Sequence, residues 1–278
     1  MSDLLNIVRV TKPEECVLDR LDPNGPPGIS ESDAKEKLKN LCEEMGELQE
    51  LLSGSRKNGL LIVVQGQDAS GKDGTIRRAL QGFSPLFCRA IAFKKPSVQE
   101  FRHDFLARIH AHSPGLGEIA LFNRSHYEDI LVPSVHGTMS SELLDKRFEH
   151  IRAFENLLLD SGVIVLKFFL HISREEQESR LRARETNLDR AWKLDVEDWQ
   201  ERAHWQQYQE TYQKILDRSS QPHAPWFVIP ANRKWLRNVL VAQVVVDAMR
   251  QNRAVWRQEL RHTAMQFQNQ IQKLRTDH

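Results

Sequence analysis

Cysteine is scarce in this chain. Its 278 residues include three cysteines, Cys16, Cys42 and Cys88, at wide spacing and without a C-x-x-C pair. An odd number of scattered thiols does not make a disulfide framework, and the missing pair removes the common zinc motifs. We therefore expect no structural disulfide and no zinc centre, in a reducing compartment for which the cytoplasm is the default.

Long apolar runs and an excess of charge of one sign are lacking as well. No run reaches the roughly 18 apolar residues that cross a bilayer, and residues 1–5 carry no basic stretch ahead of an apolar core. The formal net charge of +1 excludes a generally basic coat for nucleic acid, although it is compatible with a local cationic groove. We therefore expect neither a membrane nor nucleic acid as a partner.

The chain does contain enough apolar residues for one substantial core. With 40% hydrophobic and 28% charged residues, it fits one catalytic domain with extensions better than two domains. Turn-forming residues crowd positions 22–28, which predicts an arm, and helical spacing then runs from Ser30 to Gly54. We divide the chain into an arm with a packing helix (1–55), a domain (56–250) with a lid at about 174–204, and a helical tail (251–278).

The tail carries apolar residues at helical spacing on an otherwise polar segment. They are Val255, Leu260, Phe267 and Ile271. Such a stripe packs either on a partner subunit or on the chain's own domain, and the sequence does not decide between the two. The first reading predicts a homo-oligomer, either a dimer or a tetramer.

Apolar runs that are rich in β-branched or aromatic residues recur along the domain, separated by helical patterns. They lie at 59–64, 87–93, 118–122, 163–170 and 226–229. One intervening helix is predicted at about 140–160, with Gly162 after its end. This alternation predicts an α/β fold with a parallel sheet covered by helices on both faces.

A glycine-rich loop follows the first of these runs. It reads GQDASGKDGT over residues 66–75. Backbone N–H groups in such a loop, with the N-terminus of the following helix, bind phosphate oxygens, and Lys72 adds a mobile positive charge. A purely structural glycine turn is the alternative. The candidate phosphate-binding residues of the loop are Gly66, Ala69, Ser70, Gly71, Lys72, Asp73 and Gly74.

Two acidic residues make this loop unusual. The residue after the lysine of a P-loop is ordinarily Ser or Thr, whose hydroxyl ligates magnesium, but here it is Asp73, and Thr75 comes two residues later. Asp68 would repel phosphates from inside the loop unless a divalent cation or an arginine compensates for it. We therefore predict a metal role for Asp68, with a capping or turn role as the alternative.

A second polar segment, NRSHYED, occupies 123–129 directly after an apolar run. Ligands gather at the carboxyl ends of parallel strands, so this segment should face the phosphate loop. Arg124 can grip a phosphate, and Glu128 and Asp129 can complete a magnesium site with Asp68, or else form a solvated helix start. His126 is more often a hydrogen-bonded structural histidine than a covalent phosphate carrier.

Positive charge concentrates in two clusters. One contains Arg77, Arg78, Arg89, Lys94, Lys95 and Arg102, and the other contains Arg180, Arg182, Arg184, Arg190 and Lys193. The second cluster predicts a basic lid that closes on phosphates, with Arg180 as a catalytic residue and Arg184 and Lys193 as phosphate contacts. The alternative is a set of exposed helix arginines paired with Glu175, Glu176, Glu178 and Glu185.

At these residues the sequence resembles the polyphosphate kinase 2 family, and most closely its class III, over nearly the whole chain. The motifs that carry the resemblance are GQDASGKDGT (66–75), HDFL (103–106), RIH (108–110), FNRSHYED (122–129), RAWK (190–193) and APWFVIP (224–230). The resemblance implies a three-layer α/β/α P-loop kinase fold with a helical lid. It also implies Mg²⁺ dependence, with Mn²⁺ as the alternative ion, and reversible in-line transfer between inorganic polyphosphate and AMP, ADP and ATP.

The resemblance also implies roles for single residues. Asp68 and Lys72 are similar to the aspartate and lysine of the family's loop, and Arg124 to the arginine after its second acidic motif. Many members have aspartate where this chain has Asn123, so the metal ligands expected here are Asp68 and Asp129. Asn123, His126 and Glu128 are the candidates for nucleotide contact, with Glu128 and Asp129 also catalytic candidates.

Three functions are consistent with these residues. The first is a polyphosphate:AMP/ADP phosphotransferase. The second is a nucleotide or small-molecule kinase that uses ATP as donor. The third is a non-catalytic polyphosphate- or nucleotide-binding protein, which the departure at Asn123 would favour.

Overall fold

The domain is built on one mostly parallel sheet. A computed structural model describes residues 9–186 and 195–276, and within them six strands pair in the order β1-β6-β5-β2-β4-β3. The strands are β1 (Arg9–Val10), β2 (Gly59–Gln65), β3 (Cys88–Ala92), β4 (Ile119–Asn123), β5 (Val163–His171) and β6 (Trp226–Pro230). Only β1 pairs antiparallel, at the edge beside β6. The predicted parallel sheet is therefore confirmed.

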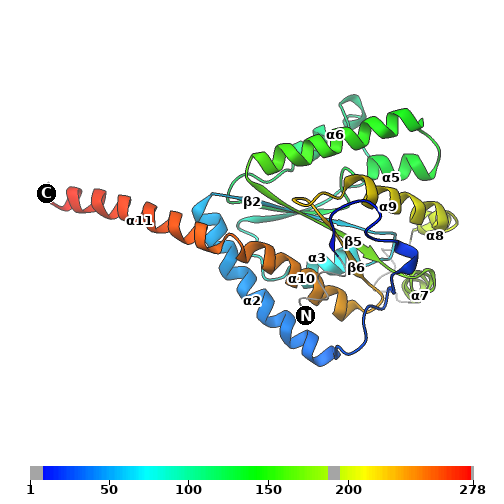
Figure 1. Cartoon of the computed structure of the whole chain (residues 1–278), viewed down its shortest axis with the longest axis horizontal. Helices are drawn as coiled ribbons and strands as arrows, with labels where there is room; N and C mark the ends of the chain where they lie inside the picture. Colours follow the sequence, from blue (N-terminus) through cyan, green and yellow to red (C-terminus); the bar gives the residue numbers. More distant parts are fainter. Residues whose placement is uncertain (1–8, 187–194, 277–278) are drawn as a thin grey trace.

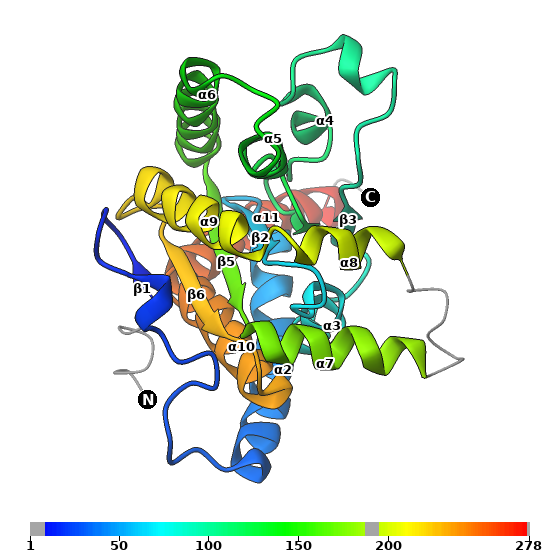
Figure 2. The ribbon, with the colours of Figure 1, turned by 90° about the vertical axis from the view of Figure 1, so that its right-hand side faces the viewer.

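Helices cover both faces of this sheet (Figures 1 and 2). The sequence of β2 is almost entirely apolar, and its alternate residues enter two separate cores. Leu60, Ile62 and Val64 belong to the core beneath α2 (Glu31–Ser55), α3 (Lys72–Ala79) and α10 (Lys234–Arg250). Leu61 and Val63 belong to the core beneath α4 (Ala107–His110), α5 (Glu128–Val135), α6 (Ser141–Asp160) and α9 (Trp205–Ser219). The layers are thus α/β/α, as expected.

The remaining elements lie outside these layers. They are η1 (Leu18–Arg20), η2 (Glu100–Arg102), α7 (Arg174–Glu185), α8 (Val196–Arg202) and α11 (Arg253–Thr276). Helix α11 begins against the domain, where Trp256 is fully buried and donates from Nε1 to Asn58 Oδ1 at 2.8 Å. It then projects well beyond the rest of the molecule (Figure 1). None of the helices in 9–186 and 195–276 is long and apolar enough to cross a membrane.

Helix ends agree with local sequence signals. Ser30 caps α2 by accepting from the backbone N–H of Asp33, and Ser140 caps α6 by accepting from that of Leu143. Strand β1 was not predicted, because two residues are too few to show an alternating pattern beside a turn-rich segment. It places part of the N-terminal arm at the edge of the sheet.

Candidate active site

The phosphate loop connects the end of β2 to the start of α3. Gly71 precedes α3 in the left-handed region, with φ 101°. A Cβ at that position would collide with Nη1 of Arg237, so the loop requires glycine there for two reasons, its backbone angle and the close guanidinium. Ala69 is also left-handed, with φ 60°. These angles set the tight path that a phosphate-binding loop needs.

Lys72 extends along the inside of the loop. Its Nζ donates to the carbonyl oxygens of Gly66, at 2.7 Å, and Gln67, at 3.2 Å. The side chain is 10% exposed. Burial lowers the pKa of Lys72, although the nearby Asp68 carboxylate opposes that shift. The ammonium group is therefore held at the loop by neutral carbonyl groups that a phosphate can replace.

Asp68 lies between two cations. Its Oδ1 accepts from Nη2 of Arg124 at 2.6 Å and is 3.8 Å from Nζ of Lys72. Burial raises its pKa, but Lys72 and Arg124 outweigh burial and hold the pKa of Asp68 below its usual value. The N-cap of α3 is Gly71, and the hydrogen bond of the Asp68 side chain comes from Arg124 rather than from the backbone of that helix. The carboxylate instead faces the site, where an arginine compensates for its charge.

The segment after β4 meets the phosphate loop, as the shared strand ends predict. The backbone N–H of Arg124 donates to the carbonyl of Val64 in β2 at 3.1 Å, and Arg124 itself has φ 63°. A left-handed arginine costs about 1–3 kcal/mol and is found mainly where its side chain has a function.

Asn123 donates from Nδ2 to Asp73 Oδ1 at 2.8 Å. The hydrogen bond therefore joins two residues that depart from the usual motifs, Asn123 and Asp73.

The carboxylates of Glu128 and Asp129, which are neighbours in the sequence, lie in different surroundings. Glu128 is close to the loop: burial raises its pKa, against the opposing charges of Arg124 and Lys72. Asp129 instead lies 3.0 Å from Nη2 of Arg108 and 3.7 Å from Nη1 of Arg147. Its carboxylate is thus paired with two arginines, and its expected roles as a metal ligand and catalytic residue stay predictions.

His126 is fully buried and contacts Glu155, with 3.3 Å from Nε2 to Oε1. Glu155 also accepts from the hydroxyl of Tyr127 at 2.7 Å and from Nζ of Lys167 at 2.7 Å. The ring has no exposed surface, and it ties the turn after Arg124 to a buried charged network. The nucleotide contact expected for His126 stays a prediction.

Arg180 donates to the backbone of the loop and of the segment after β6. Its Nη1 donates to the carbonyls of Ala69 and Ser70 at 3.0 and 2.9 Å, and its Nη2 donates to those of Ala231 and Asn232 at 2.6 and 3.0 Å. Nε donates to Glu176 at 2.7 Å. With its donors used by these carbonyls and by Glu176, Arg180 positions the loop, and its expected catalytic role stays a prediction.

The other arginines of α7 differ in their surroundings. Arg182 pairs with Glu178 on the exposed surface at 2.8 Å, as the alternative reading predicted. Arg184 forms a 2.5 Å ion pair with Asp198 of α8, and its charge lowers the pKa of Asp68, so it lies near the site. Arg190 and Lys193 lie outside the described residues.

Two residues of this site were missed in the sequence. Arg237 of α10 is 3% exposed, donates to Asn238 Oδ1 and lies against Gly71. Burial, with the adjacent Arg180 cation, lowers its pKa to about 10. Gln177 donates from Nε2 to the carbonyl of Asp68 at 3.1 Å. The sequence could have indicated Arg237, because it is a cation within the apolar face of α10. No feature of the sequence indicated Gln177.

The donor set fits a magnesium ion that arrives with phosphates. Among the described residues, no three His, Cys, Asp or Glu side chains gather into a ready-made metal site. Magnesium, however, is commonly held by one or two carboxylates together with substrate phosphates and water. Asp68 and Glu128 supply two carboxylates of that kind, within each other's electrostatic influence.

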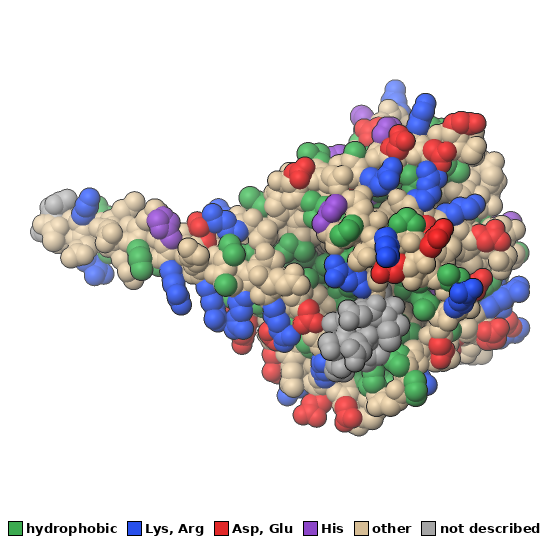
Figure 3. All heavy atoms as spheres, in the orientation of Figure 1, with side chains coloured by type: hydrophobic (Ala, Val, Ile, Leu, Met, Phe, Trp, Pro, Cys, Tyr) green, Lys and Arg blue, Asp and Glu red, His purple; other side chains and the backbone are tan. Residues whose placement is uncertain are grey.

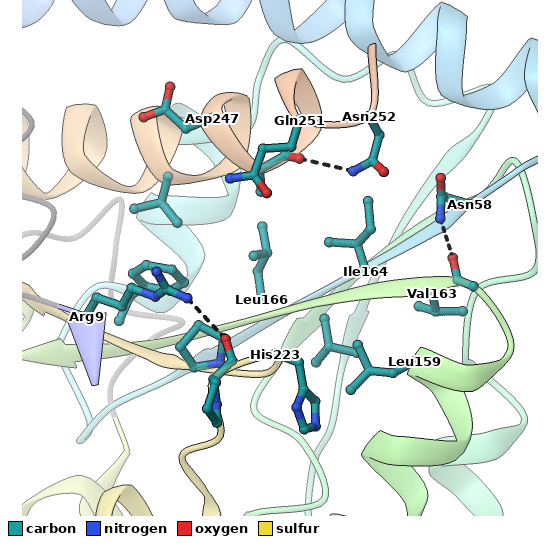
Figure 4. Close-up of a pocket in the computed structure, with 17 residues that line it drawn as sticks. Arg9, Asn58, Leu159, Val163, Ile164, Leu166, His223, Asp247, Gln251 and Asn252 are labelled. Carbon is teal, nitrogen blue, oxygen red and sulfur yellow. Dashed lines mark hydrogen bonds between the residues drawn. The ribbon is translucent and has the colours of Figure 1, made fainter. Parts of the chain in front are cut away.

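A separate cavity of about 600 Å³ opens at the other end of the sheet (Figure 4). Its floor is the first half of β5, where β6 has not yet begun to pair, and its walls include Arg9, His223 and Asp247. The phosphate loop follows the opposite end of the parallel strands. None of the predicted site residues lines this cavity, so it is distinct from the site.

Comparison with known proteins agrees with this geometry. Residues 28–256 match the family described as Polyphosphate kinase 2. The AMP/ADP-polyphosphate phosphotransferase of Meiothermus ruber is 42% identical over 234 residues, which cover 84% of this chain and 88% of that protein. The ADP-polyphosphate phosphotransferase of Rhodopseudomonas palustris is 37% identical over 226 residues, which cover 77% and 78% of the two chains.

A solved structure shows the same fold. The crystal structure of polyphosphate kinase 2 from Arthrobacter aurescens TC1 superposes with a TM-score of 0.83 at 34% identity, and the match covers 86% of this chain and 87% of that one. The family match includes the phosphate loop, the segment after β4 and Arg237. The chain therefore belongs to the polyphosphate kinase 2 family.

Proposed function

We propose that this chain transfers phosphoryl groups from inorganic polyphosphate to nucleoside mono- and diphosphates, converting AMP to ADP and ADP to ATP, and that the transfer is reversible. The observation that carries this proposal is the convergence of Lys72, Asp68 and Arg124 where β2 and β4 end. The name of the Meiothermus ruber relative, an AMP/ADP-polyphosphate phosphotransferase, supports both acceptors.

The chemistry is positioning and charge stabilisation. Phosphoryl transfer proceeds in line and needs little covalent work from the protein, so the loop amides, Lys72 and Arg124 bind phosphates and stabilise their charge. A phosphohistidine intermediate at His126 has no support, because that ring is fully buried. Arg180 and Arg237 support the loop by donating to its backbone: Arg180 donates to the carbonyls of Ala69 and Ser70, and Arg237 donates to that of Ser70 at 3.5 Å.

A divalent cation belongs to this proposal. Asp68 and Glu128 are the residues that would hold it, and Mg²⁺, or alternatively Mn²⁺, would neutralise the charge of the transferring phosphates. The chain's own contribution is to keep Asp68 ionised beside Arg124. Arg184 adds positive charge on the α7 side.

The test is a transfer assay with separate acceptors. Purified protein is incubated with Mg²⁺ and long-chain polyphosphate, first with AMP and then with ADP, and ADP and ATP are followed by chromatography. We expect both products from AMP. Product from ADP alone would restrict the proposal to diphosphates. Consumption of ATP without any need for polyphosphate would contradict the proposal and favour an ATP-dependent kinase.

Asn123→Asp is expected to increase the protein's dependence on divalent cations. In that variant a carboxylate replaces the amide that donates to Asp73, so two carboxylates meet at a distance where they repel. We expect a lower Tm than wild type without Mg²⁺ and a larger gain in Tm when Mg²⁺ is added. Asn123→Ala, which removes the hydrogen bond without adding charge, is the control. Equal Mg²⁺ responses in the two variants would contradict the expectation.

A further inference from the structure

Strand β5 has a free edge along its first half. It pairs with β2 from Val163 onward, but it pairs with β6 only from Lys167 onward. Pro225, which directly precedes β6, has no N–H group with which to continue that ladder. The free edge is the floor of the cavity of about 600 Å³ at the end of the sheet opposite the phosphate loop. This cavity opens on the face shown in Figure 3, where apolar side chains are visible between α10 and β6.

The backbone groups of Val163 and Val165 point from the free edge into the cavity. The N–H and C=O groups of successive residues in a strand point to alternate sides. The carbonyl of Gly162, directly before β5, accepts from the first N–H of β2 at 3.2 Å. The carbonyl of His171 accepts on the other side, from the N–H of Ala231 after β6, at 2.8 Å. Odd-numbered residues of β5 therefore direct their backbone groups away from β2, and before β6 begins these groups meet the cavity.

These backbone groups lack a protein partner on the cavity side. Within residues 9–186 and 195–276, neither Val163 nor Val165 forms a hydrogen bond there, although both residues are buried. Buried N–H and C=O groups are normally paired. The carbonyl of Val163 and the N–H of Val165 are neighbours along the free edge, an acceptor beside a donor. A complementary ligand therefore presents a hydrogen-bond donor beside an acceptor.

The walls of the cavity favour a flat ligand. Val244 and Ala248 of α10 line it on one side of β5, and Leu159 and His223 line it on the other (Figure 4). A ring that bonds to the free edge continues the plane of the sheet, so its two faces contact these two walls. The volume lies within the range of roughly 300–1,000 Å³ that is usual for small-molecule sites. A planar heteroaromatic ring therefore fits both the edge and the walls.

An added peptide strand suits this edge less well. Only Val163 and Val165 offer backbone groups, and so short a ladder contributes little stability. At one end of the free edge β6 already occupies the pairing position. At the other end β5 begins directly after Gly162, whose carbonyl accepts from Nδ2 of Asn58 at 2.9 Å. A single ring uses both available groups without needing a longer edge.

We propose that this cavity binds a nucleobase, carried by a nucleoside or a nucleotide. The amino group of adenine donates to the carbonyl of Val163, and the neighbouring ring nitrogen accepts from the N–H of Val165. Bases in protein pockets are commonly bound in this way, through their Watson–Crick edge and apolar contacts on the ring faces. Arg9 in the wall donates from Nη2 to the carbonyl of Pro222 at 3.1 Å, and its guanidinium has further N–H groups for a phosphate. The proposal is independent of the proposed function, because the cavity is separate from the phosphate loop.

The first test locates the base by photolabelling. The full-length protein is irradiated with 8-azidoadenosine, which carries no phosphate for the phosphate loop, and labelled peptides are identified by mass spectrometry. We expect label in segments 159–166 and 244–252, with unlabelled adenosine as an effective competitor. Ala248→Leu adds bulk to the wall and should weaken this labelling about tenfold or more. Ala254→Leu, at an exposed position of α11, is the matched control, and circular dichroism establishes that both variants are folded.

Two results of that test would overturn the proposal. One is label confined to segments 66–75 and 123–129, which would place the base at the phosphate loop alone. The other is undiminished labelling of the cavity segments in a folded Ala248→Leu variant.

The second test examines the hydrogen bonds to the free edge. Competition for labelling of the cavity segments is measured with two analogues of adenosine. The first, 7-deazaadenosine, keeps the amino group and its neighbouring ring nitrogen and should compete as well as adenosine. The second, 6-dimethylaminopurine riboside, lacks the amino N–H groups and should compete about tenfold less well. Equal competition by the two analogues would overturn the assigned contacts with Val163 and Val165.

The third test distinguishes a nucleotide from a nucleoside. AMP and adenosine are compared as competitors at the cavity segments, in the wild type and in Arg9→Gln. Stronger competition by AMP that is lost in Arg9→Gln would identify the ligand as a nucleotide, and equal competition would identify it as a nucleoside. Both results support the base site. Failure of both compounds to compete would overturn it.

Discussion

Lys72→Ala is expected to lower the turnover of phosphoryl transfer by about 10²–10³-fold, the usual effect of removing one preorganised donor from a transition state. The side chain is 10% exposed, and its Nζ donates to two backbone carbonyls and lies 3.8 Å from Asp68 Oδ1. Its charge is therefore not committed to a close salt bridge and is available to a phosphate. The measurement is kcat for ADP formation from AMP and polyphosphate.

The fold should survive this change. Asp68 keeps its 2.6 Å hydrogen bond from Arg124, so its charge remains paired when Lys72 is removed. We expect the Tm of Lys72→Ala to stay within a few degrees of wild type, and Lys72→Met, which keeps the volume, to be equally inactive. Lys57→Ala is the matched control, because Lys57 forms its ion pair with Glu259, at the start of α11. Near-normal turnover in Lys72→Ala would contradict the assignment of the site.

Lys167→Met is expected to cost about 3–5 kcal/mol of unfolding free energy, the usual loss when one partner of a buried ion pair is removed. Lys167 and Glu155 are both fully buried, 2.7 Å apart, and Lys167 also donates to the carbonyl of Ser219 at 2.8 Å. The variant leaves the buried Glu155 carboxylate without its lysine partner, with His126 Nε2 still 3.3 Å from Oε1. Urea denaturation followed by circular dichroism provides the measurement.

This loss should depend on pH. In the wild type, burial opposes ionisation of Glu155, but Lys167 and His126 outweigh burial and lower its pKa. A carboxyl with a lowered pKa contributes stability that is present above its unfolded pKa of about 4.3 and is lost as the pH falls. Without Lys167, burial dominates and raises the pKa of Glu155, so the variant should lose stability as the pH rises. The gap between wild type and variant should therefore be wider at pH 8 than at pH 5.

A second substitution separates the charge effect from packing. Lys167→Met combined with Glu155→Leu removes both charges, and it should recover part of the lost stability, because apolar replacement of a buried pair is often neutral. The pH dependence should disappear with it. A double variant less stable than Lys167→Met at pH 8 would show that the hydrogen bonds of Glu155, rather than its charge balance, stabilise the network.

The parts of the fold that sequence predicted are those encoded locally. Strand β2 is a continuous apolar run and the loop after it has a specific glycine and lysine pattern, so both could be assigned without tertiary information. Strand β1 could not, since its two residues gain their structure only by pairing with β6. The same holds for the site. Asp68, Lys72 and Arg124 come just after parallel strands end, and ligand sites lie at the carboxyl ends of such strands, so their convergence could be predicted.

The roles of the polar residues after β4 were not predictable from the sequence. Those roles depend on where each side chain points, and that is set by the backbone angle at Arg124. Arg124 is left-handed, and the turn that follows buries His126 and separates Glu128 from Asp129. A run of polar letters contains no sign of which ones face inward. The hydrogen bonds of Arg180 could not be predicted for a related reason: the sequence indicated its charge but not the loop carbonyls that accept from it.

The strand order has a consequence for synthesis of the protein. Strand β2 lies between β4 and β5, and β5 ends at His171, so the strand that carries the phosphate loop gains its second neighbour only after most of the chain has left the ribosome. Arg237, which packs against Gly71, emerges later still. Because non-local parallel pairing is slow and its loop-closure entropy must be met first, the nascent chain carries the lysine and aspartate of the site long before it can hold them in place. An unfinished chain is therefore expected to expose the apolar β2 rather than to bind phosphate.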